Sequence, residues 1–144
     1  MCVPELTNAL NHWLTNNGFT TRVETIIGYW GYAQEIDTIE ICVQEEPEDV
    51  DLWEQFLYED IKCPLRYDIF YTSFLHELGH AFTASFFTIE DRRRANASLS
   101  VFDYFHSPIE RAATEWAIQF MMAETEMMRE LVNLIDPILE KVRF

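Results

Sequence analysis

Two histidines and a glutamate lie close together near the middle of the chain, in the segment His76-Glu77-Leu78-Gly79-His80. On an α-helix, residues four apart lie one turn apart on the same face, so the two imidazoles can reach one ion. The side chain of Glu77 is rotated by one residue from that of His76, which lets its carboxylate meet a water molecule beside the ion. This is the HExxH pattern of zinc peptidases, in which the glutamate is the general base.

The residues around this motif predict a helix that is buried against a core. An apolar stripe recurs at every fourth position and is formed by Phe70, Phe74, Leu78, Phe82 and Phe86. The motif would then lie close to an interior surface, where an unpaired charge is costly and a metal ion would satisfy both histidines. Random placement would produce roughly 0.01 motifs of this kind in a chain of this length. The alternative interpretation is a pair of hydrogen-bonded histidines at the edge of the core.

A catalytic zinc site has, as a rule, three protein ligands and one open position. The longer motif with a further Gly and His does not fit, because those positions hold Thr83 and Phe86. The remaining candidates for the third ligand follow later in the chain and are Asp103, His106, Glu110 and Glu115.

The strongest local signal near these candidates is a helix start at Ser107 and Pro108. Glu110 opens this predicted helix, where it could serve either as the third ligand or as the capping-box glutamate of the helix. His106, just before the helix, is the alternative ligand. If it is not a ligand, either it or Tyr104 could hydrogen-bond a transition-state oxyanion.

Two segments of the chain together resemble a known family. The segment HELGHA at 76–81 is followed about thirty residues later by ERAATEWA at 110–117. They resemble the ImmA/IrrE metallopeptidases, minimal gluzincins that cleave DNA-binding repressors in bacteria and their mobile elements. The second motif of that family reads Glu-x-x-Ala-Asn/Asp-x-Phe-Ala, so Glu110, Ala113 and Ala117 match and Trp116 stands for the aromatic residue. The resemblance implies Zn²⁺ as the cofactor, Glu110 as its third ligand, and a repressor-type DNA-binding protein as the substrate.

Two positions in these segments bear on how the site is held together. Thr114 replaces the Asn or Asp with which the family supports a ligand by hydrogen bonding, so a different hydrogen bond is needed there. Gly79 costs a helix interior about 1 kcal/mol relative to Ala, which predicts that a neighbouring strand or helix approaches closely at this point. In peptidases of this type an edge strand lies beside the metal helix, and the range 38–43 is the candidate.

The composition excludes several classes of function. The net charge of −15 argues against direct nucleic-acid binding, which requires Lys and Arg to neutralise phosphates. No apolar run approaches the ~18 residues of a membrane span, and the first residues lack the features of a signal peptide. The three cysteines (Cys2, Cys42 and Cys63) are too few for a disulfide framework. We therefore expect a cytoplasmic protein with reduced thiols.

The charge is concentrated in one stretch. Eleven acids and no Lys or Arg lie between Glu35 and Asp60. Such a stretch attracts a basic protein surface, so the expected partner is a protein or peptide substrate, such as a basic repressor. The only basic cluster is Arg92-Arg93-Arg94. We interpret this cluster as part of a solvated loop. The alternative is that it contacts a carboxylate of the substrate.

The expected fold is α+β, a mainly helical, minimal zincin-like single domain over residues 1–144 with a small sheet. The predicted helices are one over Leu6–Leu14 that stops at Asn17-Gly18, one over 50–61, one over 67–87, and a helical region from Pro108 to the C-terminus with a break at Pro137. The range 91–98 is predicted as a polar stretch. Two strand-like runs, 20–27 and 38–43, are expected to pair as a hairpin around a long aromatic loop.

Together these features predict a zinc metalloendopeptidase with Glu77 as the general base. The alternative is an acidic binding or inhibitor protein from a phage or mobile element, whose zinc site is structural. A former peptidase retained as a scaffold is the third possibility, and it would bind zinc without turnover. Replacing Glu77 by Gln separates these hypotheses, because only the first needs that carboxylate.

Overall fold

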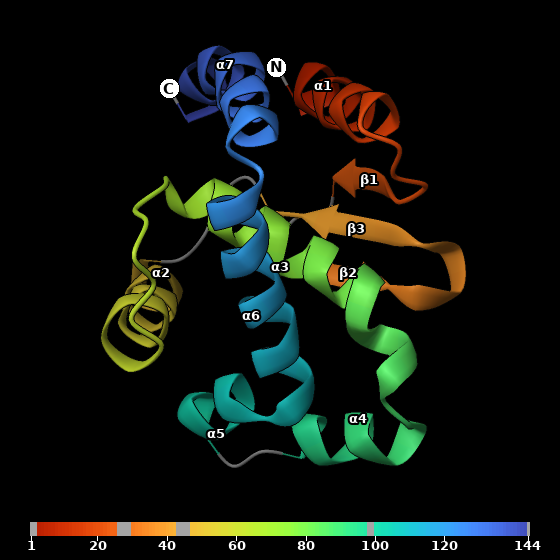
Figure 1. Ribbon diagram of the computed structural model, residues 1–144, viewed down its shortest axis with the longest axis vertical. Helices are drawn as coiled ribbons and strands as arrows, with labels where there is room; N and C mark the ends of the chain where they lie inside the picture. Colours follow the sequence, from red (N-terminus) through yellow and green to blue (C-terminus); the bar gives the residue numbers. More distant parts are fainter. Residues whose placement is uncertain (1–2, 26–29, 43–46, 98–99, 144) are drawn as a thin grey trace. The chain divides into compact units, whose positions relative to one another are not determined.

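The computed structural model describes residues 3–25, 30–42, 47–97 and 100–143. Helices dominate and accompany a small three-stranded sheet, so the fold is α+β and mainly helical, as predicted (Figure 1). Contacts along the chain divide it into two compact units. The terminal unit comprises Met1–Glu45 and Met121–Phe144, and the central unit comprises Glu46–Phe120. Within the described ranges, no helix combines the length and the apolar character needed to cross a bilayer.

The core of the terminal unit is formed by two helices, α1 (Val3–Asn16) and α7 (Thr125–Arg143), which pack against each other. The predicted apolar face of α1 is buried, and Trp13 Nε1 donates a hydrogen bond to the carbonyl oxygen of Met127 at 3.0 Å. Gly18, with a φ of 81°, follows the end of α1, as expected of a left-handed residue that stops a helix.

Pro137 lies inside α7 and does not break it, contrary to the prediction. The proline removes one backbone donor, but Ile135, Ile138 and Leu139 on either side of it are buried, and this packing holds the helix together. The interruption comes earlier, at Glu124, where α6 (Pro108–Ala123) ends and α7 begins.

The sheet has the strand order β1-β3-β2, with β1 at Arg22–Thr25, β2 at Gly31–Ala33 and β3 at Thr38–Ile41. The predicted hairpin between the first and last strand-like runs is wrong, because β1 and β3 are parallel. The antiparallel neighbour of β3 is β2, which comes from the predicted aromatic loop. The ends of the predicted runs, at 26–27 and 43, lie outside the described residues.

A turn at Asp37 makes β2 and β3 antiparallel neighbours. Asp37 has a left-handed backbone with a φ of 47°, and it follows the 3₁₀ turn Gln34–Ile36 that reverses the chain between β2 and β3. Its carboxylate accepts hydrogen bonds from the hydroxyls of Thr20, Thr21 and Tyr32. One side chain therefore ties the approach to β1, strand β2 and the turn together.

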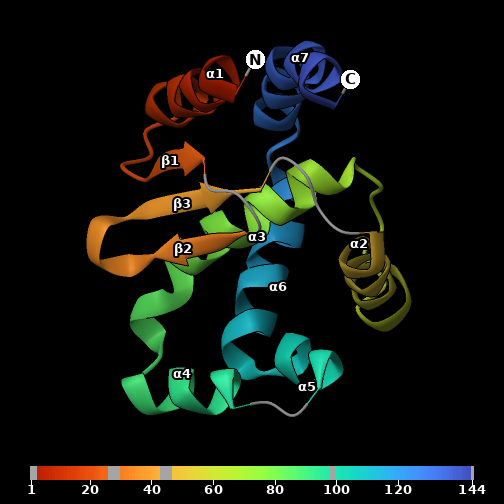
Figure 2. The ribbon, with the colours of Figure 1, turned by 180° about the vertical axis from the view of Figure 1, so that it is seen from behind.

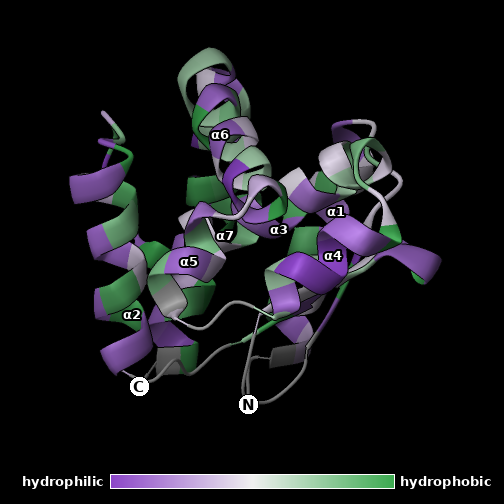
Figure 3. Cartoon of the chain, turned by 90° about the horizontal axis from the view of Figure 1, so that it is seen from below, coloured by the Kyte–Doolittle hydropathy of each residue, from purple (hydrophilic) through white to green (hydrophobic). Residues whose placement is uncertain are grey.

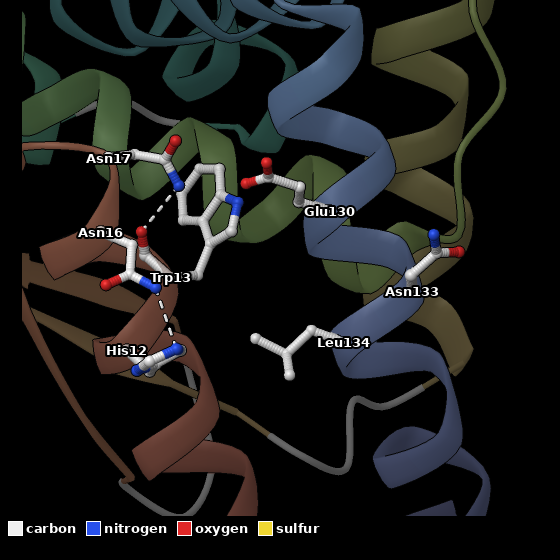
Figure 4. A pocket seen from close by; sticks show the side chains of 7 residues that line it. All are labelled: His12, Trp13, Asn16, Asn17, Glu130, Asn133 and Leu134. Carbon is white, nitrogen blue, oxygen red and sulfur yellow. Dashed lines mark hydrogen bonds between the residues drawn. The ribbon is translucent and has the colours of Figure 1, made fainter.

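A hollow of about 430 Å³ opens between α1 and α7 in the terminal unit (Figure 4). It is lined by His12, Trp13, Asn16, Asn17, Glu130, Asn133 and Leu134. Two of its amides already have partners, because Asn16 Nδ2 lies 2.9 Å from His12 Nε2 and Asn17 Nδ2 donates to the carbonyl oxygen of Trp13. None of the predicted site residues lines this hollow.

The central unit is helical. It begins with α2 (Pro47–Glu54), which continues as a π-helix over Gln55–Asp60. The next helix, α3 (Ile69–Thr83), is followed by a 3₁₀ turn at Ala84–Phe86, and α4 (Ile89–Asn96) and α5 (Val101–His106) lead to α6. The structure thus agrees with the helices predicted near 50–61 and 67–87, the latter ending in 3₁₀ geometry.

The range predicted as a polar stretch forms most of α4, so Arg92, Arg93 and Arg94 are helical and not in a loop. The residue at 98 lies outside the described residues. Figure 3 shows how hydrophilic α4 is, which is why no apolar periodicity revealed it. A capping box replaces that signal: Thr88 Oγ1 accepts from the Asp91 amide at 3.1 Å, and Asp91 Oδ2 accepts from the Thr88 amide at 2.9 Å.

Candidate metal centre

Helix α3 carries the whole HExxH motif, as the sequence predicts. The helix is capped by Asp68, whose carboxylate accepts from the Phe70 amide at 2.9 Å. His76 and Glu77 are both buried, with 6 % of each residue exposed. An ionisable group at such depth requires a partner of opposite charge, a hydrogen bond or a metal.

The apolar stripe of α3 is buried only in part. Phe70, Phe74 and Leu78 belong to the core, whereas Phe82 and Phe86 are exposed, which corrects the prediction for these two residues. For Phe86 the reason is that α3 ends at Thr83, so this residue lies in the following 3₁₀ turn and not on the helix face. Phe82 stacks on Trp116 with ring centroids 4.9 Å apart.

Glu110, in the first turn of α6, lies against both histidines of α3. Its Oε1 is 3.1 Å from His76 Nε2, and its Oε2 is 3.1 Å from His80 Nε2. One ligand atom from each of these three residues can be chosen so that all lie within 4.8 Å of one another. Glu110 thus directs its carboxylate to the histidines. The hydroxyl of Ser107, which would form the other half of a capping box, donates instead to the carbonyl oxygen of Tyr104 at 2.7 Å. The capping-box role considered for Glu110 is not what its carboxylate does here.

Gly79 allows α3 and α6 to come this close. A Cβ atom at position 79 would overlap the backbone carbonyl of Ala113. The predicted close approach is therefore to a helix, α6, and Glu110 lies one turn before Ala113 on that helix. The strand proposed as the neighbour, β3, belongs to the terminal unit, whereas α3 belongs to the central unit.

Thr114 determines which nitrogen of His76 carries a hydrogen. Its hydroxyl donates to the backbone carbonyl of Glu110 at 3.0 Å, and His76 Nδ1 lies 2.9 Å from the same hydroxyl oxygen. Because a hydroxyl has one proton and this one points to the carbonyl, its oxygen accepts from His76 Nδ1–H. In the neutral imidazole with its hydrogen on Nδ1, Nε2 carries the lone pair that a metal ligand needs. Thr114 thus supports His76 by a hydrogen bond from α6.

The charge distribution around the three residues calls for a cation between them. Burial, the largest effect, raises the pKa of Glu110, but hydrogen bonds and charge from His76 and His80 outweigh it and hold this pKa well below its usual range. For His80, burial lowers the pKa, but the hydrogen bond and charge of Glu110 and the charge of Glu77 raise it overall, while Arg92 lowers it. The raised pKa of His80 favours a proton, and hence a positive charge, at this position. A divalent metal would replace this proton.

Two further groups border the cluster. Glu77 Oε1 lies 3.9 Å from His80 Nε2, and its carboxylate is outside the set of atoms that could hold a metal. The phenol of Tyr104, on α5, has a pKa well above its usual range because of burial, the charges of Glu110 and Glu77, and a hydrogen bond to Glu110. Tyr104 therefore stays protonated and can donate a hydrogen bond at this site, which is the property that an oxyanion-stabilising group needs.

The other candidate ligands lie elsewhere. His106 Nε2 is 3.5 Å from Asp60 Oδ2, and its ring lies 4.2 Å from that of Phe102, so it forms a separate cluster and is not a member of the triad. Glu115 accepts a hydrogen bond from Arg111 Nε at 3.0 Å. Asp103 is exposed in the first turn of α5.

One neighbour of the cluster was not expected from the sequence. Trp53, on α2, packs edge-on against the imidazole of His76 with ring centroids 5.1 Å apart. Its Nε1 donates to Thr72 Oγ1 at 3.0 Å, which anchors the indole to α3 one turn before the motif. No spacing or motif in the sequence connects Trp53 with His76, because the contact arises only when α2 packs on α3.

Comparison with protein-family models, with curated protein sequences and with solved structures finds no significant match for this chain.

Proposed function

We propose that this protein is a zinc-dependent peptidase whose metal is held by His76, His80 and Glu110. The observation that carries the proposal is the convergence of two Nε2 atoms and one carboxylate in a buried cluster, with Thr114 setting the His76 tautomer. Two imidazoles and one carboxylate are the donor set of many catalytic zinc sites, which leave one position open for water or substrate. The residues thus fit zinc.

Zinc, when bound, would supply a Lewis acid and lower the pKa of water at the open position. The chain's own residues would handle the protons. Glu77, close to His80 yet outside the ligand set, accepts a proton from the attacking water and later delivers it to the amine that leaves when the C–N bond breaks. Tyr104 donates a hydrogen bond to the oxyanion that forms on the carbonyl oxygen.

The resemblance to the ImmA/IrrE metallopeptidases supports this activity and suggests the substrate, a repressor-type DNA-binding protein. We place the protein in the cytoplasm, where thiols stay reduced. Cys63 is a free cysteine, which agrees with such a location.

The test is a comparison of zinc content and peptide hydrolysis among variants. Glu77→Gln should retain zinc and lose hydrolysis by about 10³-fold or more, since the amide cannot accept the proton of water. Glu110→Ala should lose zinc and activity together. Elemental analysis after dialysis and mass spectrometry of a peptide mixture measure the two properties.

His106→Ala is the matched control, because His106 was the alternative ligand and lies outside the triad. It should keep its zinc. Loss of zinc in His106→Ala with retention in Glu110→Ala would contradict the assignment of the third ligand. Zinc binding with no hydrolysis by the wild-type chain would favour a structural site in a binding or scaffold protein.

A further inference from the structure

Arg92 is held in a defined place by the segment that leaves the metal helix. After α3 ends at Thr83, the 3₁₀ turn Ala84–Phe86 leads to Thr88, the N-cap of α4. The capping box between Thr88 and Asp91 fixes the first turn of α4, and Arg92 is the next residue. The backbone at Arg92 is thus part of an ordered helix and not of a loop.

Helix α4 is connected to the candidate metal centre through its neighbour α5. Helix α4 contacts α5, and α5 carries Tyr104, which hydrogen-bonds to Glu110. Figures 1 and 2 show from opposite sides that α4 and α5 both lie near the end of α6 at which Glu110 is found. The charge of Arg92 also reaches His80, where it lowers the pKa of the imidazole.

Arg92 differs from the other two arginines of the triplet. Arg93 and Arg94 are exposed, and Arg93 Nη1 lies 4.0 Å from Glu90 Oε2. Arg92 is partly buried, and no carboxylate among the described residues lies within 4.0 Å of its guanidinium. A planar guanidinium held in this way is suited to bind a carboxylate in a bidentate fashion.

We propose that Arg92 binds a carboxylate of the peptide substrate and thereby selects acidic peptides for the metal centre. This inference rests on the proposed function, because it presupposes a metal that binds the scissile carbonyl. The carboxylate can come from an acidic side chain near the cleaved bond or from the C-terminus of the peptide. Arg92 is a specificity residue in this scheme and takes no part in proton transfer.

The probes for the test are short hydroxamates, which bind a metal at one end. One series carries a carboxylate at the other end (the monohydroxamates of succinic, glutaric, adipic and pimelic acid), and the matched series carries a carboxamide. Dissociation constants are measured by calorimetry with the zinc-loaded protein at low ionic strength. At the best chain length the carboxylate should bind about tenfold more tightly than its carboxamide, as a charge-assisted hydrogen bond would produce.

Arg92→Gln should abolish this preference while leaving the affinity for the carboxamide series unchanged, and Arg92→Lys should retain part of it. Arg93→Gln is the matched control: it removes the same charge from the same helix and should keep the preference. Equal affinity of both series for the wild-type protein would overturn the role of Arg92 while leaving the metal site standing. Binding of neither series to the wild-type protein would overturn the metal site and this inference together.

Peptides distinguish the two sources of the carboxylate. A mixture of peptides with free C-termini is compared with the same mixture amidated, and the products are identified by mass spectrometry. Loss of cleavage upon amidation assigns Arg92 to the terminal carboxylate. If the amidated peptides are still cleaved next to Asp or Glu, and Arg92→Gln removes this cleavage, Arg92 binds an acidic side chain. Cleavage that depends on neither carboxylate would contradict the proposal.

Discussion

At the scale of single residues, the hydrogen bond between Thr114 and His76 has the most direct consequence. Thr114→Val keeps the shape of the side chain but cannot accept the hydrogen on His76 Nδ1. The imidazole is then free to change tautomer or turn away, so we expect zinc affinity to fall by about tenfold or more, as for other partners of metal-binding histidines. Competition with a chelator at pH 7 measures this affinity.

The matched variant is Thr114→Ser, which restores the hydroxyl with one methyl group fewer. It should return zinc affinity to within a few fold of the wild type, even though the buried position loses some packing. If the Val variant binds zinc as tightly as the wild type, the hydroxyl has no part in orienting His76.

At the scale of secondary-structure elements, the contact between α3 and α6 decides whether the ligands meet. Gly79→Ala places a Cβ against the backbone carbonyl of Ala113 and pushes the two helices apart. Alanine favours the helix by about 1 kcal/mol, but overpacking costs about 1–3 kcal/mol, so the net change in the free energy of unfolding is small or unfavourable. Zinc affinity should fall markedly, since Glu110 moves with α6. Urea unfolding and chelator competition measure the two quantities.

Gly18→Ala provides the control for general destabilisation. Gly18 has open space around it but a φ of 81°, so alanine is strained there and lowers stability without touching the metal helices. It should leave zinc affinity unchanged. If Gly79→Ala also leaves zinc affinity unchanged, the close approach of α3 and α6 does not hold the site together.

At the scale of the whole molecule, the net charge of −15 should govern encounters with a basic partner. Exposed acids on α2 and the π-helix that follows it include Asp51, Glu54 and Glu59. Changing these three to Lys should slow association with a purified, positively charged repressor domain by about tenfold at low salt, while zinc content stays the same. The difference should shrink as salt rises, because the screening length falls to about 8 Å at physiological ionic strength. Stopped-flow kinetics at several salt concentrations measure the rate.

The matched control reverses three exposed acids of the terminal unit, Glu124, Glu130 and Glu140. It changes the net charge equally and should slow association less, because it leaves the acidic stretch intact. Equal effects of both triple variants would mean that net charge alone acts. Rates independent of salt would leave the acids only the role of keeping the protein soluble.

The sequence alone determined the features that depend on short-range rules. The fourfold spacing of His76 and His80 predicted a pair of imidazoles on one helix, because helical geometry relates residues within two turns. Apolar periodicity predicted α1 and α3, and Pro108 marked the start of α6. A helix start that rests on capping alone, such as that of α4, was missed because the prediction gave most weight to apolar periodicity.

Tertiary structure decided what depends on contacts between distant segments. Four residues could have been the third ligand, and only the approach of α6 to α3 at Gly79 brings Glu110 to the two histidines. The same approach brings Thr114 to His76, whereas His106 lies beside Asp60. In the sheet, β1 pairs with β3 in parallel, and β2 forms the antiparallel pair with β3 that the sequence had assigned to β1. Local sequence restricts each segment to a helix or a strand, but its neighbours are selected by packing of the whole chain, which no local pattern encodes.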